Sequence, residues 1–292
     1  MRFGAVFPQL EIGNDPVAIR DFGQAVEAMG FAHLIAYDHV LGAHPRHFRG
    51  KFAPRYTHLD PFHEPLVLFG YLAAATRRIV LATGIIVLPQ RNAVLVAKQA
   101  AALDVLSGGR LRLGVGAGWN FAEYAGLGAD FKNRGKVYSE QLDLMNALWQ
   151  KPLVRFRGKY HRLDDLGLNP LPVQRPIPLW FGGQSDAAMK RVVKWGQGWI
   201  AEPPPGPDGK AMIERLHAFA RKAKRKPGSI RIDRVMYANE GKVADWRRDI
   251  AFYRSVGVTD VSLDTQRAGF KNVDQHLKAL RQFSELAAEF AG

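Results

Sequence analysis

Residues 79–119, IVLATGIIVLPQRNAVLVAKQAAALDVLSGGRLRLGVGAGW, contain the pattern that decides the fold. The apolar run Ile79–Leu88 predicts a buried strand, and Leu111–Val115 predicts another. Between them, Val94–Leu106 predicts a helix that stops at Ser107–Gly109, because glycine commonly follows the last turn of a helix. Two strands joined through a helix imply that the strands pair in parallel.

The same alternation continues on both sides of this stretch. Further strands are expected at Arg2–Pro8, Phe31–Tyr37, Ile177–Phe181, Gly198–Ala201, Ile230–Tyr237 and Asp260–Leu263. Further helices are expected at Asp15–Met29, Pro65–Thr76, Val137–Trp149, Asp186–Trp195, the segment ending at Lys226, Val243–Val256 and Val273–Ala291. These eight strand–helix pairs predict an α/β protein with the architecture of a (β/α)8 TIM barrel.

A doubly wound open sheet is the alternative to a barrel. It would place a glycine-rich phosphate loop after the first strand, and the segment FPQLEIG lacks the necessary glycines. The proline-rich connection Lys151–Pro178 indicates an insertion around residues 150–176, because connections of this length are usually functional. No Pro/Gly/Ser-rich linker divides the chain, so we expect one domain over residues 1–292.

Composition excludes several classes of protein. The chain has 292 residues, a formal net charge of +14 and no cysteine, which rules out disulfides, a thiolate nucleophile and cysteine-ligated metals. No apolar run approaches the roughly 20 residues that span a membrane, and no secretory signal is recognisable, so we expect a cytoplasmic protein without a membrane partner. The positive charge either attracts a polyanion or a charged cofactor, or reflects an ordinary basic surface.

In a TIM barrel the active site lies at the carboxyl ends of the strands. The segments expected there are Phe7–Gln9, Asp38–His39, Thr83–Ile86, Gly116–Asn120, Gly182–Ser185, Trp199–Glu202 and Asp264–Arg267. Among them Asp38 and His39 are candidate catalytic residues, because an imidazole beside a carboxylate can donate or accept a proton near neutral pH. An ordinary loop histidine is the alternative.

The loop that follows His39 is rich in histidine and arginine. His39, His44 and His47 share it, but their spacing matches neither a helical pair of ligands nor a zinc finger, so no metal is expected. The segment Gly42–His58 contains no acidic residue and four basic ones, Arg46, Arg49, Lys51 and Arg55. We therefore expect a positive loop beside the site.

Two glycine-rich turns are candidate cofactor sites. Gly114–Trp119, GVGAGW, lacks the full dinucleotide fingerprint, and either forms a floor for a flat ring or lets a strand turn closely into its loop. Gly182–Ser185 follows a strand and opens a helix, so its backbone N–H groups suit a phosphate. A tight turn in which Ser185 only caps the helix is the alternative.

Four segments taken together resemble the bacterial luciferase-like monooxygenase superfamily. They are FGAVFPQ, EAMGFAHLIAYDHVLG, RIVLATGIIVLPQRNAVLVAKQAAALDVLSGGRLRLGVGAGWNFAEY and LWFGGQSDAAMKRVVKWGQGW, which occur in this order. Within the superfamily the chain is most similar to the F420-dependent oxidoreductase branch. The resemblance implies a (β/α)8 barrel, usually a homodimer, that binds FMN or the deazaflavin coenzyme F420 at the C-terminal face and moves a hydride through the cofactor ring.

The same resemblance assigns roles to residues. His39 would lie beside the ring, with Asp38 orienting it or contacting the ring. The residues implied to contact the cofactor are Thr83, Gly84 and Ile85 in a bulge behind the ring, Ala117, Gly118 and Trp119 along the ring or its side chain, and Gly182, Gly183, Gln184 and Ser185 at the phosphate. A non-prolyl cis peptide is implied at Gly84–Ile85. Sugar-phosphate dehydrogenase relatives have a catalytic glutamate where this chain has Trp119, which argues against sugar-phosphate oxidation by that acid. Whether Glu123 takes part in proton transfer stays open.

Three functions remain open at this point. The first is an F420-dependent oxidoreductase acting on a small molecule, supported by the acid-free basic loop, because F420 carries an anionic polyglutamyl tail. The second is an FMN-dependent two-component monooxygenase, which would use FMNH2, dioxygen and a separate flavin reductase as partner. The third is a non-catalytic barrel that binds a polyanion. No nucleic-acid partner is expected, because the basic run Arg221–Lys226 suits a solvated helix end.

Overall fold

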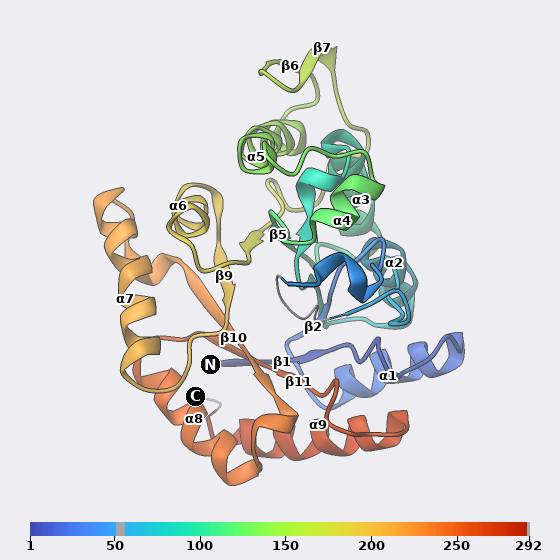
Figure 1. The fold of residues 1–292 in the computed structure, drawn as a ribbon, viewed down its shortest axis with the longest axis vertical. Coiled ribbons are helices and arrows are strands. Elements are labelled where there is room, and N and C mark those ends of the chain that lie inside the picture. Colours follow the sequence, from blue (N-terminus) through green and yellow to red (C-terminus); the bar gives the residue numbers. More distant parts are fainter. Residues whose placement is uncertain (51–55, 291–292) are drawn as a thin grey trace.

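Eight parallel strands close into a barrel in the computed structural model, which describes residues 1–50 and 56–290 (Figure 1). The barrel strands are β1 (Arg2–Val6), β2 (His33–Ala36), β3 (Val80–Thr83), β5 (Leu111–Gly116), β8 (Leu179–Phe181), β9 (Gly198–Ala201), β10 (Arg231–Tyr237) and β11 (Asp260–Asp264). The barrel closes where β1 pairs with β11 and where Leu81 of β3 pairs with Leu111 of β5. The predicted TIM barrel is confirmed.

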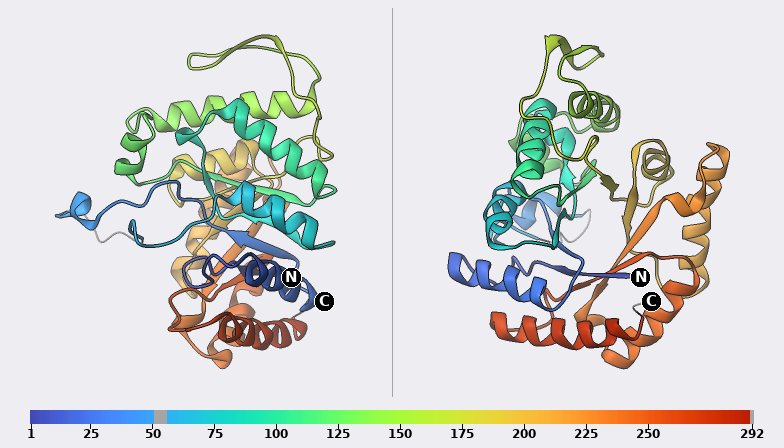
Figure 2. Two further views of the ribbon diagram at one scale, coloured as in Figure 1. Left: turned by 90° about the vertical axis from the view of Figure 1, so that its right-hand side faces the viewer. Right: turned by 180° about the vertical axis from the view of Figure 1, so that it is seen from behind.

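Helices surround the barrel and return the chain to the start of each next strand (Figures 1 and 2). They are α1 (Pro16–Ala28), α2 (Pro65–Ala75), α3 (Ala93–Leu106), α4 (Phe121–Gly126), α5 (Arg134–Gln150), α6 (Asp186–Trp195), α7 (Pro207–Lys222), α8 (Val243–Ser255) and α9 (Val273–Ala288). Short 3-10 turns are η1 (Pro45–Phe48), η2 (Leu88–Gln90), η3 (Pro227–Ser229) and η4 (Ala238–Glu240). The eight strand–helix pairs follow the predicted order, and α4 is an additional short helix between β5 and α5.

The strand predicted over residues 79–88 is broken in the structure. β3 ends at Thr83, Gly84 and Ile85 form a bulge, and β4 (Ile86–Val87) then pairs with the end of β5. The hydropathy of the run predicts one continuous strand, because a bulge changes the direction of the backbone without changing the hydropathy of the sequence. The bulge that the family resemblance implies at Thr83–Ile85 is present.

The insertion around residues 150–176 contains an antiparallel hairpin, β6 (Val154–Arg157) and β7 (Arg162–Leu166). It extends beyond α5 and away from the barrel (Figure 2). The returning chain is held near the start of β5, where Gln174 donates hydrogen bonds to Asp104 and to the carbonyl of Leu111. The hairpin of the insertion therefore does not cover the carboxyl ends of the barrel strands.

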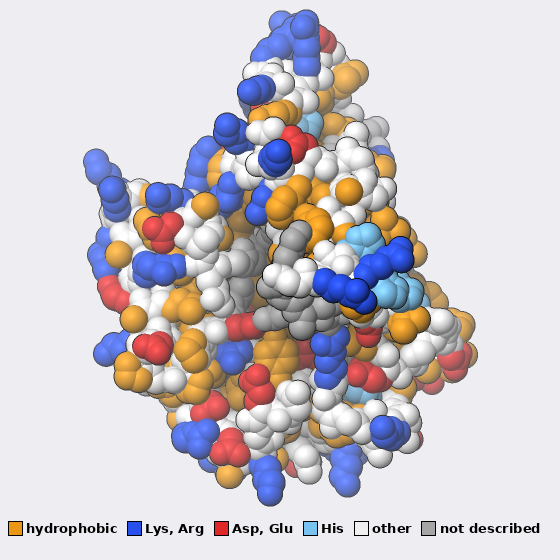
Figure 3. Space-filling model, viewed as in Figure 1, with side chains coloured by type: hydrophobic (Ala, Val, Ile, Leu, Met, Phe, Trp, Pro, Cys, Tyr) orange, Lys and Arg blue, Asp and Glu red, His pale blue; other side chains and the backbone are white. Residues whose placement is uncertain are grey.

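Lysine and arginine side chains are spread over the face of the molecule drawn in Figure 3, and acidic side chains lie among them. None of the helices in the described part of the chain is long and apolar enough to cross a membrane.

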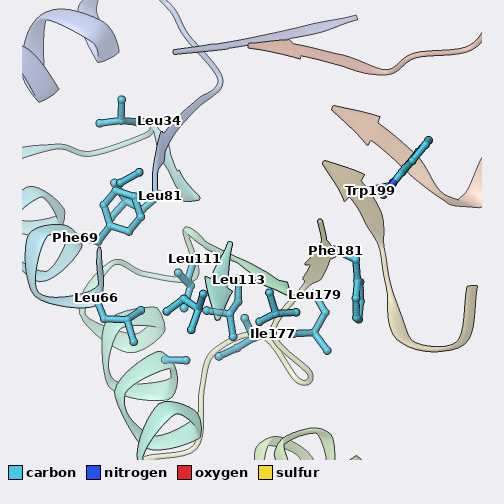
Figure 4. Packing of buried hydrophobic residues seen from close by; sticks show 14 of the residues in the cluster. Leu34, Leu66, Phe69, Leu81, Leu111, Leu113, Ile177, Leu179, Phe181 and Trp199 are labelled. Atoms are coloured by element: carbon cyan, nitrogen blue, oxygen red, sulfur yellow. The ribbon is translucent and has the colours of Figure 1, made fainter. Parts of the chain in front are cut away.

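The main hydrophobic core lies between the barrel wall and the helices around it. Figure 4 shows Phe69 of α2 pointing toward Leu81 of β3, and both side chains are buried. Burying a leucine or phenylalanine contributes roughly 1.5–3 kcal/mol, so this layer holds the strands at fixed positions. A smaller cluster of buried residues comprises Val6, Ile35, Ala82 and Val235.

Candidate functional site

The residues predicted to form the site follow the carboxyl ends of β2, β3, β5 and β8. Parallel strands bring these ends to one face of the barrel, so segments far apart in sequence become neighbours there. His39 comes three residues after β2, and Trp119 comes three residues after β5. Their rings lie 6.4 Å apart in an edge-to-face arrangement.

His39 contacts Glu123, which lies in the first turn of α4. Nδ1 of His39 is 3.4 Å from Oε2 of Glu123, and the glutamate side chain is buried. The other carboxylate oxygen accepts the backbone N–H groups of Val40 at 2.7 Å and Leu41 at 3.1 Å. One carboxylate therefore holds both the imidazole and the backbone that follows it.

Several contacts keep Glu123 ionised. Burial opposes its charge, but the contact with His39 and the backbone N–H groups of Leu41 and Val40 outweigh burial and lower the pKa of this carboxyl. An ionised carboxylate only accepts hydrogen bonds, so His39 carries its hydrogen on Nδ1 and leaves Nε2 available. The imidazole thus has one defined orientation.

Tyr56 completes this group of side chains. Its ring stacks on His39 with ring centroids 3.5 Å apart, and its hydroxyl donates to Glu123 at 3.2 Å. Asn120 donates to the same hydroxyl at 2.8 Å, while its side-chain oxygen accepts the backbone N–H of Glu123 and caps α4. Burial raises the pKa of Tyr56 well above its usual range, so the phenol stays protonated. We call His39, Glu123, Tyr56 and Asn120 the histidine cluster.

Asp38 has a different environment from His39. Its buried carboxylate accepts the backbone N–H of Val87 at 3.0 Å and pairs with Arg91 at 2.6 Å. Arg91 also pairs with Glu64, which caps the start of α2. Burial is the largest influence on Asp38 and raises its pKa, although Arg91 opposes this. Asp38 thus joins the end of β2 to β4, and the carboxylate in contact with His39 belongs to Glu123.

The bulge after β3 packs inside the barrel mouth. Thr83 donates its hydroxyl to the carbonyl of Gly114 at 2.8 Å, and the N–H of Gly84 bonds to Ala36. Ile85 extends across the neighbouring strand ends, since a β-carbon on Gly116 would lie 2.5 Å from its Cδ1. A β-carbon on Gly182 would lie 2.7 Å from its Cγ2. These two glycines therefore make room for Ile85.

The cis peptide implied at Gly84–Ile85 is wrong for this structure. Among the described residues, cis peptide bonds occur at Asn169–Pro170 and Arg175–Pro176. A non-prolyl cis bond costs about 3–4 kcal/mol, and the bulge forms here with a trans bond.

The turn after β5 is shaped by close backbone contacts. Ala117 accepts the hydroxyl of Tyr124 at 2.6 Å through its carbonyl oxygen. Gly118 has a φ of +64°, and a β-carbon there would lie 2.5 Å from Val87. Trp119 lies edge-on to Tyr56, with ring centroids 5.6 Å apart. The turn therefore brings Trp119 against the histidine cluster.

Gly182–Ser185 leads from β8 into α6. Gly182 donates to the carbonyl of Val115, and the Ser185 hydroxyl accepts the backbone N–H of Ala188 as a helix cap. Gly183 has a φ of +96°, which favours glycine. Within the described part of the chain, the backbone N–H groups of Gly183, Gln184 and Ser185 have no acceptor. The geometry is compatible with both interpretations of this segment: Ser185 caps the helix, and the free backbone N–H groups can donate to an anion.

A second polar group at the same end of the barrel comes from the predicted strand ends Trp199–Glu202 and Asp264–Arg267, to which the sequence assigned no role. The hydroxyl of Tyr37 donates to Asp264 at 3.0 Å, and Gln266 donates its backbone N–H to the other carboxylate oxygen at 2.8 Å. Burial dominates and raises the pKa of Asp264 to about 6. Tyr237 donates to Glu202 nearby. The only sequence signal for these acids is their position at strand ends.

The basic loop is described in part. Arg46 and Arg49 are exposed, and no carboxylate pairs with them in residues 1–50 or 56–290. Lys51 and Arg55 lie outside the described residues. Figure 3 shows Lys, Arg and His side chains gathered in one part of the surface.

Comparison with known proteins gives the family. A family model described as luciferase-like monooxygenase matches residues 1–285. An uncharacterized protein from Mycobacterium tuberculosis is 33% identical over 212 residues, which cover 70% of this chain and 73% of that protein. An uncharacterized relative from Mycobacterium bovis is 31% identical over 181 residues, and the chain spans 62% of its length. An FMNH(2)-dependent dimethylsulfone monooxygenase from Pseudomonas putida is 30% identical over 165 residues, covering 55% of this chain and 45% of that enzyme.

Solved structures share the fold. A monooxygenase from Streptomyces bottropensis superimposes with a TM-score of 0.79 at 19% identity, covering 100% of both chains. A coenzyme F420-dependent tetrahydromethanopterin reductase from Methanopyrus kandleri superimposes with a TM-score of 0.77 at 16% identity, covering 99% of both chains. Together with the match over residues 1–285, these similarities lead to one conclusion: this chain belongs to the luciferase-like monooxygenase family of oxidoreductases.

Proposed function

We propose that the protein is an F420-dependent oxidoreductase that acts on a small-molecule substrate at the C-terminal face of the barrel. The observation that carries the proposal is the pair formed by His39 and the buried, ionised Glu123 at this face. The choice of F420 is supported by the exposed Arg46 and Arg49, because the coenzyme has an anionic tail that arginine binds well.

The residues at this face fit such a cofactor. The unpaired backbone N–H groups of Gly183, Gln184 and Ser185 at the start of α6 suit its phosphate. Ile85, packed over Gly116, offers an apolar surface for one side of a ring. When bound, F420 supplies a ring that accepts or donates a hydride.

The chain's own residues then have separate tasks. Glu123 holds His39 so that Nε2 is available to donate or accept a proton at the substrate. Tyr56 stacks on the imidazole of His39, and together with Trp119 it limits the access of water to that ring. We assign Asp38 a positioning task, because its carboxylate anchors the end of β2 through Arg91.

FMN is the second candidate cofactor. It is favoured by the similarity to the FMNH(2)-dependent monooxygenase from Pseudomonas putida. In that case the protein would use dioxygen and would depend on a separate flavin reductase. A homodimer located in the cytoplasm stays our prediction for either cofactor.

Titration of the apo-protein with F420 and, separately, with FMN tests the proposal through cofactor fluorescence. We expect tight binding of F420 and weaker binding of FMN. In the double variant Arg46→Ala/Arg49→Ala, F420 affinity should fall at least tenfold, because each charge-assisted contact is worth roughly 1.5–3 kcal/mol. The matched control removes two exposed arginines elsewhere, Arg254→Ala/Arg281→Ala. If the protein binds FMN in preference to F420, FMN replaces F420 as the proposed cofactor. If it binds neither, both proposals are refuted.

A further inference from the structure

The opposite end of the barrel contains a cavity of about 150 Å³. It is lined by residues at or near the starts of six strands, namely Arg2, His33, Val80, Leu111, Arg231 and Asp260. A cavity of about this size is enough to hold a benzene molecule, so a small polyatomic ligand fits. The candidate site described above lies at the other ends of these strands.

Positive charge dominates this cavity. Its lining includes Arg2, Arg110, Arg112 and Arg231, against the single carboxylate of Asp260. His33 adds no charge at neutral pH, because burial and the neighbouring Arg112 lower its pKa. Asp233 lies behind the lining, where it pairs with Arg112 at 2.7 Å. The arginines therefore outnumber the carboxylates that could balance them.

Two of the arginines have donors that nothing in the described chain accepts. Nε of Arg112 is buried and has no partner among the described residues, and the residue as a whole is 5% exposed. Arg2 is exposed, and its guanidinium makes no hydrogen bond or ion pair with the described residues. Arg110 differs, because its guanidinium donates to the carbonyls of Ile79 and Ala73.

Arg112 is held rigidly. Its guanidinium lies 4.2 Å from the ring centre of Trp180, which is a cation–π distance. The same ring packs on Gly198, where a β-carbon would approach it to 2.3 Å. Since its terminal nitrogen also bonds to Asp233, the direction of its unpaired N–H is fixed before any ligand arrives.

A metal ion is the competing occupant, because ligand atoms of His33, Asp233 and Asp260 lie within 4.8 Å of one another. Both carboxylates are already engaged. Asp233 accepts from Arg112 and Ser262, and both oxygens of Asp260 accept from Arg231. A cation would have to displace these arginines and would be repelled by them.

We propose that this cavity binds a small oxyanion with the chemistry of a phosphate group, held by Arg2 and the Nε–H of Arg112. Arginine suits this ligand because its planar, permanently charged guanidinium matches the geometry of phosphate oxygens. The anion would connect the starts of β1 and β5, and the site is independent of the cofactor proposed at the opposite face.

Thermal unfolding at constant ionic strength, with increasing inorganic phosphate, tests the proposal. Binding to the folded state alone raises the midpoint in a saturable, concentration-dependent way. Arg2→Gln should weaken phosphate binding at least tenfold, as expected for one lost charge-assisted contact. Arg20→Gln, which removes an exposed arginine of α1, is the matched control and should titrate like the wild type.

A further variant tests the second arginine. Arg112→Lys keeps a cation beside Asp233 but loses the Nε–H, so it should also weaken binding. Equal titrations of Arg2→Gln and Arg20→Gln, or no effect of phosphate on the wild type, would each overturn the proposal.

A parallel titration with glycerol 3-phosphate identifies the source of the anion. A preference for inorganic phosphate in the wild type, lost in Arg2→Gln, would assign the site to the free ion. A preference for the ester, lost in the same variant, would assign it to the phosphate group of a larger molecule.

Discussion

The carboxylate of Glu123 contacts both the imidazole of His39 and the backbone that follows it. Oε2 lies 3.4 Å from Nδ1 of His39, and Oε1 accepts the N–H of Val40 at 2.7 Å. The two residues are 84 positions apart in the chain. This contact links the loop after β2 to the helix after β5, so it couples the position of the loop to the state of one acid.

Replacing His39 by alanine should reduce turnover much more than cofactor affinity. A positioned general acid or base contributes about 10²–10⁴-fold to rate, and we expect a loss in that range. Steady-state kinetics combined with fluorescence titration of the cofactor separates the two effects. His217→Ala, in α7, is the control. Equal losses of turnover and of affinity would identify His39 as a binding residue.

Glu123→Gln should destabilise the protein at pH 7 by about 1–3 kcal/mol, because a buried, multiply hydrogen-bonded carboxylate is replaced by a neutral amide. The pKa of Glu123 is lowered in the folded state, so its stabilisation is complete above the unfolded value near 4.3 and is lost as the pH falls below it. The free energies of unfolding of wild type and variant should therefore converge in acid.

Urea unfolding at pH 7 and at pH 3 measures this difference. Glu285→Gln replaces an exposed glutamate of α9 and should show little effect at either pH. A difference between Glu123→Gln and wild type that stays constant with pH would contradict the assignment of an ionised Glu123.

Gly116→Ala should destabilise the barrel mouth by about 1–3 kcal/mol, the range expected for overpacking. The new β-carbon would lie 2.5 Å from Cδ1 of Ile85. Shortening that side chain by Ile85→Ala removes the clashing atom, so the double variant should lose less stability than the sum of the two single variants. A double-mutant cycle of unfolding free energies measures this coupling.

Gly70→Ala is the control for this cycle. Gly70 lies within α2 with open space around the position of its β-carbon, so alanine there should stabilise the helix by up to about 1 kcal/mol. Additive effects of Gly116→Ala and Ile85→Ala would mean that the two residues do not pack as described.

The free energy of unfolding of Asp264→Asn, compared with that of the wild type, should increase as the pH rises. Burial raises the pKa of Asp264 to about 6 in the folded state, against an ordinary value of 3.8. Between these values the folded state binds a proton that the unfolded chain has released, so the wild type loses stability as the pH increases through this window. The asparagine variant cannot titrate and avoids that loss.

The expected size of this effect is about 3 kcal/mol between pH 4 and pH 7, from roughly two units of pKa. Chemical unfolding of wild type and Asp264→Asn at both pH values checks it. A variant whose stability relative to wild type falls with rising pH would show that folding lowers the pKa of Asp264.

The local sequence pattern was sufficient to predict the order of the helices and strands. Apolar runs such as Leu111–Val115 and helix stops such as Ser107–Gly109 depend on neighbouring residues, and the structure contains the corresponding strand and helix end. The hydropathy pattern does not predict the break between Thr83 and Ile86, because its cause is the packing of Ile85 against Gly116 and Gly182 from other strands. Only the family resemblance implies a bulge there.

The candidate site was predictable only where it adjoins a strand end. His39 was found in this way, and its structural neighbour Glu123 stayed undecided. Tyr56 was not singled out, because its stacking on His39 and its bond to Glu123 join segments that approach each other only in the folded chain. Asp264 was expected at this face, but its contact with Tyr37, 227 residues away, was not predictable for the same reason.

Arg91 has a consequence for local opening of the protein. Its guanidinium pairs with Asp38 after β2 and Glu64 at the start of α2, and its carbonyl accepts a hydrogen bond from Gln141 of α5. Segments joined through one residue cannot separate from each other independently. Amide hydrogens around these contacts, such as that of Val87, should therefore exchange with solvent through one shared opening event with one free energy.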